Sequence, residues 1–219
     1  MQTEIESQGQ APPLAERAYR VLRDRLIMLD LPPGSPLSES QLSAELGLGR
    51  TPLREALKRL ETDHLVVSYP RRGTFATIVD ITELAAISEV RLLLEPAAAG
   101  RAARMLTPAL RGELEHTAAA VEAIDETRAP RELIEYDLEV HRLIYRAAGN
   151  HHLEASLVRL DNLATRIWCL VLDRLPPIAE HIAGHGALLR AILDGDDAAA
   201  QKLARDHVRD FEVTVREAL

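Results

Sequence analysis

The sequence contains a single cysteine, Cys169, among its 219 residues. One cysteine excludes a framework of intrachain disulfide bonds and suits a reducing compartment, so we expect a cytoplasmic protein. No apolar stretch approaches the roughly 18 residues that a membrane-spanning helix needs, and no signal peptide opens the chain. The sequence therefore predicts no membrane partner. Cys169, which lies among apolar residues, is expected to pack in a core.

The second half of the chain has almost no alternating, β-rich segment. Ala and Leu dominate it, and turn signals such as Thr107-Pro108, Gly149-Asn150 and Pro176-Pro177 divide it into segments. The expected helices span residues 81–105, 107–127, 130–148, 150–173, 175–194 and 196–218. Short connections between long amphipathic helices indicate an all-α antiparallel bundle.

Residues 38–62 predict two short helices joined by a tight turn. Ser38 or Glu39 begins the first helix, and Gly47 ends it near a left-handed conformation. Thr51 is expected to cap the second helix, with Pro52 at its first position, where a missing N–H costs nothing. Two short helices at this spacing are typical of a helix-turn-helix, whose second helix enters the major groove of DNA.

The second of these helices separates an apolar face from a cationic one. Leucines and alanines spaced three and four residues apart face the core, and the opposite face carries the polar set Arg50, Thr51, Arg54 and Lys58. Arg matches the guanine O6 and N7 acceptors better than any other side chain. We therefore expect this helix to bind DNA, with Arg50 and Arg54 reading bases.

A hairpin is predicted directly after the two helices. Residues 65–69 and 74–78 are β-rich and flank the turn Pro70-Arg71-Arg72-Gly73. An Arg-Arg pair at a hairpin tip is typical of a wing that contacts the phosphate backbone or the minor groove. The alternative is that Arg71 and Arg72 serve solubility alone.

Charge divides the chain into two modules. Residues 14–78 carry a net charge of +2, whereas residues 79–219 carry −8. The first 13 residues are polar and are expected to form a disordered tail. We therefore predict a winged helix-turn-helix domain at 14–78, a linker at 79–81 and a helical domain at 82–219 that stays off the DNA.

Ionisable residues interrupt the apolar faces of three helices in the predicted bundle. Asp137 and His141 are four residues apart on one face, and His185 and His207 lie on the core faces of two other helices. Metal sites of bundles are built from facing helices, and one carboxylate with three imidazoles suits Zn²⁺ first, or Ni²⁺ or Mn²⁺. The alternative is a set of hydrogen-bonded core histidines. His181 is an alternative ligand. Three further histidines are expected to be solvated: His116, His151 and His152.

Arg91 is a second inward-facing charge, because it shares a helix face with apolar residues. A buried guanidinium needs a partner. That partner is either Glu95, one turn along the helix, or an anionic effector, since Arg binds carboxylates through two parallel hydrogen bonds. Asn162 and Arg166 lie one turn apart and are expected to line the same effector pocket, unless they face solvent.

The motifs of the first module resemble a known family. Over about 45 residues, the order and spacing of these residues resemble those in the winged helix-turn-helix of GntR-family bacterial transcription regulators. The matching residues are Pro32, Pro33, Gly34, Leu37, Glu39, Leu42, Leu46, Gly47, Arg50, Thr51, Pro52, Arg54, Glu55, Ala56, Leu57 and Leu60. Two departures are Gly49, where the family has Ser or Thr, and Thr62-Asp63-His64 in place of Glu-x-Gly. His64 must therefore adopt a turn that Gly makes easily.

The second module resembles the FCD effector-binding domain of the FadR subfamily, over about residues 82–213. The resemblance is carried by Asp137-x-x-x-His141, His185, Gly195-Asp196 and His207. It implies a divalent metal bound by Asp137, His141, His185 and His207. An Arg in the motif Glu89-Val90-Arg91 faces the ligand cavity in this subfamily, which implies the same for Arg91.

Two function classes are compatible with these observations. The first is a DNA-binding transcription regulator, a repressor, that responds to a small carboxylate effector and binds a palindromic operator as a homodimer. The second is a metal-dependent hydrolase or lyase fused to a DNA-binding module. The chain has no glycine-rich phosphate loop, no Ser/His/Asp arrangement and no candidate base beside the metal ligands. The sequence therefore favours the regulator and predicts no catalytic residue.

Overall fold

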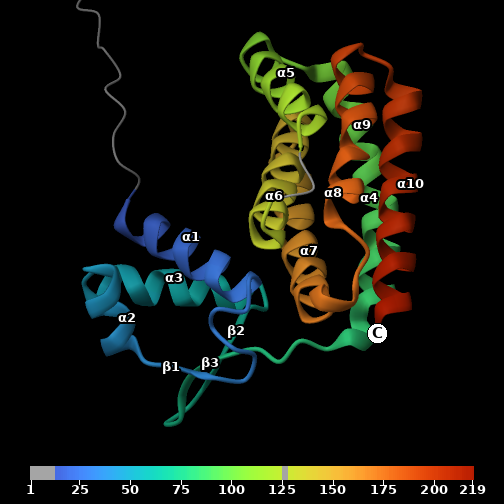
Figure 1. The fold of residues 1–219 in the computed structure, drawn as a ribbon. Coiled ribbons are helices and arrows are strands. Elements are labelled where there is room, and N and C mark those ends of the chain that lie inside the picture. Colours follow the sequence, from blue (N-terminus) through green and yellow to red (C-terminus); the bar gives the residue numbers. More distant parts are fainter. Residues whose placement is uncertain (1–12, 125–127) are drawn as a thin grey trace, which may run out of the picture. The chain divides into compact units, whose positions relative to one another are not determined.

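The computed structural model describes residues 13–124 and 128–219, which form two compact units that divide between Ile78 and Val79 (Figure 1). Residues 1–12 of the predicted tail and the last three residues of the predicted helix 107–127 lie outside the described residues. The described chain is mainly helical, with one small antiparallel sheet. The predicted fold class, a winged helix-turn-helix followed by an all-α bundle, is confirmed.

The described part of the first unit, from Pro13 to Ile78, contains three helices and a three-stranded sheet. In chain order its elements are α1 (Leu14–Ile27), β1 (Pro36–Leu37), α2 (Glu39–Leu46), α3 (Arg50–Thr62), β2 (Val66–Tyr69) and β3 (Gly73–Ala76). The strands lie in the order β1-β3-β2, and both pairings are antiparallel. β1 is missed by the sequence analysis, because two residues are too few to show an alternating pattern.

α3 forms the centre of the first unit. Its apolar face is buried through Leu53, Ala56, Leu57 and Leu60, and it packs against α1. The prediction that Thr51 caps this helix is wrong. α3 begins two residues earlier than predicted, at Arg50 and not at Pro52, because the extended backbone of Gly49 supplies the N-cap without a side-chain hydrogen bond.

The turn after α3 contains the left-handed residue that the sequence analysis predicts. His64 has a φ of 61°. The turn is closed by backbone hydrogen bonds from the His64 N–H to the Glu61 carbonyl and from the Leu65 N–H to the Leu60 carbonyl, at 3.1 and 2.9 Å. A left-handed conformation costs a residue with a Cβ about 1–2 kcal/mol, so the surrounding turn stabilises His64 against strain.

The second unit is a bundle of helices around α4. Its elements are η1 (Ile81–Glu83), α4 (Leu84–Met105), α5 (Pro108–Glu122), α6 (Pro130–Ala147), α7 (His151–Leu170), η2 (Leu172–Arg174), α8 (Ile178–Ala183), α9 (His185–Leu193) and α10 (Asp197–Ala218). α4 packs against α6, α7, α9 and α10, and runs beside α10 along the bundle (Figure 1). Side-chain caps at Thr107, Asn150 and Asp196 fix the starts of α5, α7 and α10.

The predicted helix 175–194 is two helices in the structure. Pro176 and Pro177 delay its start to Ile178, and the helix is interrupted at Gly184, which separates α8 from α9. Gly184 itself keeps a right-handed helical conformation, with φ −56° and ψ −27°. α8 is therefore a separate element of six residues that brings His181 to the same core as His185.

The core of the bundle is rich in alanine, which lets helices approach closely. Ala98, Ala99 and Ala102 of α4 are fully buried, as is Ala200 of α10. Within the described residues, no helix is long and apolar enough to cross a membrane.

Candidate DNA-binding face and metal centre

The exposed face of α3 carries the predicted DNA-binding set. Arg50, Thr51, Arg54 and Lys58 are all exposed. The Arg54 Nε donates a 2.8 Å hydrogen bond to the Glu39 carboxylate of α2. An ion pair this exposed contributes little to stability, so DNA can compete for Arg54 at small cost.

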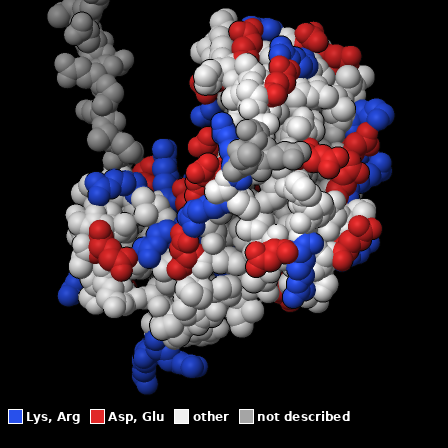
Figure 2. All heavy atoms as spheres, in the orientation of Figure 1, with Lys and Arg blue, Asp and Glu red and all other residues white. Residues whose placement is uncertain are grey.

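The tip of the β2–β3 hairpin carries the second part of this face. Arg71, Arg72 and Gly73 are exposed, and Arg71 and Gly73 have φ angles of 63° and 94°. The Arg72 guanidinium lies 5.8 Å from the centre of the Tyr69 ring. Figure 2 shows basic side chains projecting where Figure 1 draws this hairpin. The tip can therefore reach a phosphate backbone or a groove.

One exposed arginine of α3 makes its contacts within the first unit. Arg59 donates a 2.6 Å hydrogen bond to Glu16 of α1, and its guanidinium lies 3.9 Å from the centre of the Tyr19 ring. Tyr19 in turn donates a 2.7 Å hydrogen bond to Asp63. Arg59 therefore joins α1 to α3 and is not part of the candidate DNA-binding face.

The four predicted metal ligands lie together in the bundle. Asp137 and His141 come from α6, His185 from the start of α9 and His207 from α10, and one donor atom of each lies within 4.8 Å of the others. The His185 Nε2 is 3.2 Å from the His141 Nε2 and 3.7 Å from the Asp137 Oδ1, and the His141 Nε2 is 3.8 Å from the Asp137 Oδ2.

The three separations among Asp137, His141 and His185 fit a shared divalent ion. Two donors that each lie about 2.1 Å from one ion are separated by about 3.0 Å at an angle of 90° and about 4.2 Å at 180°. Asp137 is 3% exposed, and its Oδ1 accepts no hydrogen bond from any described residue. A buried carboxylate oxygen without a partner is costly, and a cation at this position would satisfy it.

Hydrogen bonds outside the cluster orient two of its imidazoles. The His185 Nδ1 lies 3.1 Å from the Ile182 carbonyl, to which it donates, so the Nε2 keeps its lone pair. The His141 Nδ1 lies 3.1 Å from the Tyr145 hydroxyl and 3.7 Å from the Glu95 carboxylate. This pattern, in which the outer nitrogen is held and the inner one faces the cluster, is typical of metal-bound histidines.

Burial sets the charge of the cluster without a metal. It raises the pKa of Asp137 well above its ordinary value, and it lowers the pKa values of His141 and His207 well below theirs. Burial likewise lowers the pKa of His185 to about 4. The imidazoles are therefore neutral near pH 7, which is the form that binds a metal.

Arg91 of α4 is 2% exposed and is held by two carboxylates. Its Nε donates a 2.6 Å hydrogen bond to Glu95, and its Nη2 lies 3.4 Å from Asp161 of α7. Burial alone would lower the pKa of Arg91, but these carboxylates more than offset it and raise the pKa. The sequence analysis raised Glu95 as a partner, and it missed Asp161.

Asn162 and Arg166 of α7 are both buried, at 1% and 2% exposure. The Asn162 side-chain oxygen accepts a 3.4 Å hydrogen bond from Arg142. Burial lowers the pKa of Arg166 to about 10. Neither residue faces solvent, and their predicted role in binding an effector, like that of Arg91, stays a prediction.

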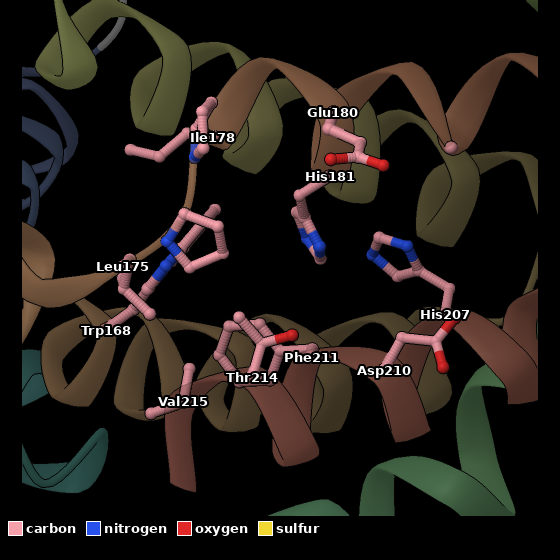
Figure 3. A pocket seen from close by; sticks show the side chains of 13 residues that line it. Trp168, Leu175, Ile178, Glu180, His181, His207, Asp210, Phe211, Thr214 and Val215 are labelled. Atoms are coloured by element: carbon pink, nitrogen blue, oxygen red, sulfur yellow. The ribbon is translucent and has the colours of Figure 1, made fainter. Parts of the chain in front are cut away.

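A pocket of about 400 Å³ opens beside the predicted metal ligands (Figure 3). Its wall is formed by Trp168 of α7, the segment between η2 and α8, α8 itself and the second half of α10. Besides Trp168, the lining residues are Leu175, Pro176, Pro177, Ile178, Glu180, His181, Gly184, His207, Asp210, Phe211, Thr214 and Val215. Arg91, Asn162 and Arg166 do not line it. Sequence analysis missed this pocket, because it depends on how α8 folds back towards α10.

Two family models match the chain. Residues 14–76 match the model of bacterial regulatory proteins of the gntR family, and residues 86–210 match the FCD domain. The chain is a GntR-family regulator with an FCD domain. The resemblance of the two modules to the GntR family and to the FCD domain is confirmed. Membership of this family makes the protein a DNA-binding transcription regulator and not an enzyme. The alternative of a hydrolase or lyase is therefore set aside.

Relatives of this GntR-family regulator match it over nearly its whole length. The HTH-type transcriptional repressor RspR of Escherichia coli K12 is 25% identical over 94% of this chain and 90% of its own. The repressor GlaR of the same strain is 29% identical over 87% and 90%. The solved structure of E. coli McbR/YncC has a TM-score of 0.81 at 22% identity, covering 94% of this chain and 99% of the other. That structure supports the fold.

Proposed function

We propose that this regulator is a repressor whose binding to an operator is controlled by a small organic acid. The acid would bind in the FCD domain beside a divalent ion held by Asp137, His141, His185 and His207. Zn²⁺ suits one carboxylate and three imidazoles best, and Ni²⁺ or Mn²⁺ also fit this donor set. Two relatives carry the name repressor, which supports the direction of control.

The unpartnered Oδ1 of Asp137 is the observation that carries the metal centre. It lies 3.7 Å from the His185 Nε2, which must present a lone pair because its Nδ1 donates to a carbonyl. A carboxylate oxygen and an imidazole lone pair repel each other unless a proton or a cation lies between them. A divalent ion satisfies both donors at once.

The charge of the pocket favours a role for that ion in binding the acid. Among the described residues that line the pocket, the charged ones are Glu180 and Asp210, and none is Lys or Arg. Carboxylates at the rim would repel an acid. A bound divalent ion supplies the positive charge that attracts a carboxylate, since it is the largest local charge in such a site.

We propose that Arg50, Thr51, Arg54, Lys58, Arg71, Arg72 and Gly73 contact the operator, and that the protein binds it as a homodimer. One winged helix-turn-helix reads only a few base pairs, so two-fold pairing on a palindrome is the usual solution. Sizing chromatography and light scattering of the protein, free and on DNA, test this assembly. A monomer in both samples contradicts it.

The double variant His185→Ala/His207→Ala tests the metal centre. We expect the wild-type protein to contain one divalent ion per chain and the double variant to contain none, as measured by elemental analysis. His151→Ala/His152→Ala is the matched control, because both of its histidines are exposed. Stoichiometric metal in the His185→Ala/His207→Ala protein would show that the site is wrongly assigned.

A further inference from the structure

His181 lies between the pocket and the candidate metal centre. Its Nε2 is buried and forms no hydrogen bond with any described residue. This nitrogen lies 3.6 Å from the Asp137 Oδ1. A separation of 3.6 Å is too long for a hydrogen bond, so these two atoms do not share a proton. The separation does fall between about 3.0 and 4.2 Å, the range expected for two ligands of one ion.

The ring of His181 is held in this orientation by aromatic neighbours. Its centre lies 4.3 Å from that of His207, 5.0 Å from that of Trp168 and 5.9 Å from that of Phe211. Figure 3 shows the His181 and His207 rings side by side in the pocket, reaching towards each other from opposite helices. The side chain is 18% exposed, so one edge of the ring faces the pocket while the Nε2 points inward.

Three of the four predicted ligands are set back from the pocket. Asp137, His141 and His185 do not line it, whereas His181 and His207 do. A molecule in the pocket therefore meets the His181 ring before it meets the Asp137 carboxylate. His181 also belongs to α8, which has only six residues between Pro177 and Gly184. Displacement of His181 would therefore require movement of a short element and not of a long helix of the bundle.

We propose that His181 is a fifth protein ligand on the pocket side of the ion, and that an effector must displace it. This inference rests on the proposed metal centre. A single carboxylate oxygen competes poorly with an imidazole that is already positioned, because its own ordering costs free energy. An acid that offers two oxygen donors, such as a hydroxy acid or a dicarboxylate, competes better. The effector is therefore a chelating acid.

Cobalt(II) titration of the full-length protein tests the inference through its visible absorption, which reports the number and type of ligands. We expect His181→Ala to change the Co²⁺ spectrum and to weaken Co²⁺ binding. Loss of a residue that only hydrogen-bonds to a ligand weakens metal binding roughly 10- to 100-fold, and loss of a ligand itself should weaken it at least as much. Free imidazole should restore the wild-type spectrum of this variant by filling the vacated position. The control His152→Ala removes an exposed imidazole and should behave as wild type.

Two acids complete the test. Malate should change the Co²⁺ spectrum of the wild-type protein, acetate should not, and both should change that of His181→Ala. Should His181→Ala lose its circular dichroism, His181→Gln replaces it, because Gln keeps bulk and polarity. An unchanged spectrum and affinity in a folded variant overturns this inference alone. Failure of wild-type protein to bind Co²⁺, or binding that survives Asp137→Asn unchanged, overturns the proposed metal centre as well.

Discussion

At the scale of single residues, the arginines of α3 and those of the wing should contribute differently to DNA binding. Arg50→Ala or Arg54→Ala should cost about 1–3 kcal/mol at the cognate sequence and relax specificity, if each reads a guanine. Fluorescence anisotropy with the cognate duplex and with single-base variants of it measures both effects. Arg209→Ala, in the acidic second unit, is the control and should bind as wild type.

Arg72 should act through the phosphate backbone. Arg72→Ala is expected to weaken binding evenly across sequences and to reduce the slope of log K against log salt by about 1, because one phosphate contact is lost. Titrations at four salt concentrations measure the slope. Equal and sequence-independent losses in Arg50→Ala, Arg54→Ala and Arg72→Ala would contradict this division.

The buried environment of Arg91 makes its substitution a test of its role. Removing the guanidinium leaves Glu95 and Asp161 as buried, unpaired carboxylates, so Arg91→Ala should lower the free energy of unfolding by about 3–5 kcal/mol. Urea denaturation followed by circular dichroism measures the loss. If the main role of Arg91 is to bind an effector, Arg91→Ala should barely change the free energy of unfolding of the ligand-free protein. That result would contradict a structural role for Arg91 and favour the predicted contact with an effector.

At the scale of elements, the packing of α1 on α3 should depend on alkaline pH. Burial, together with a hydrogen bond to Asp63, raises the pKa of Tyr19 to about 12 from an ordinary value of 10. A group whose pKa is raised by folding contributes stability that is present below its unfolded pKa and is lost as the pH rises through the folded one. The affected window is therefore pH 10 to about 12.

The variant Tyr19→Phe isolates this effect. The stability of the wild-type protein relative to Tyr19→Phe should fall by about 1.4 kcal/mol for each pH unit within that window, because one proton is involved. Urea denaturation of both proteins at pH 9, 10.5 and 11.5 gives the difference, in which the titration of other groups cancels. A difference that is constant with pH would mean that Tyr19 ionises as easily in the folded protein as in the unfolded one.

Elements show which parts of the fold the sequence could predict. The spacing of Asp137 and His141, and the positions of His185 and His207 on apolar faces, were enough to predict a cluster, because a helical period directly fixes which side chains face a core. The partners of Arg91 were only half predictable. Glu95 is one helical turn away, but Asp161 comes from α7, and no local pattern specifies which residue of a neighbouring helix will be in contact.

Small backbone features explain the remaining differences. The start of α3 depends on Gly49, an extended residue without a capping side chain, whereas the sequence favoured Thr51, which has one. The interruption at Gly184 has no strong signal, because its backbone stays helical. That interruption and the turn at Pro176-Pro177 bring His181 to the pocket. Because neither could be predicted in this detail from the sequence, the pocket could not be predicted either.

At the scale of the whole molecule, the proposed control of DNA binding by an effector requires that the two sites influence each other reciprocally. If metal and effector together change operator affinity by some factor, the operator changes the affinity of the effector by the same factor. Coupling of this kind typically amounts to about 1–3 kcal/mol, or roughly 5- to 150-fold. The effector has to bind two arrangements of the molecule with different affinity, since equal binding shifts nothing.

This reciprocity can be measured before the natural effector is identified. A duplex selected from a random pool serves as operator, a scrambled duplex of the same length as control, and malate with Co²⁺-loaded protein as the ligand pair. For a repressor that releases DNA, malate should bind more weakly, by at least about fivefold, in the presence of the operator than of the scrambled duplex. His185→Ala/His207→Ala should show no difference between duplexes. Equal malate affinity on both duplexes in the wild-type protein would make the metal centre structural, and control of DNA binding would then have to come from another part of the bundle.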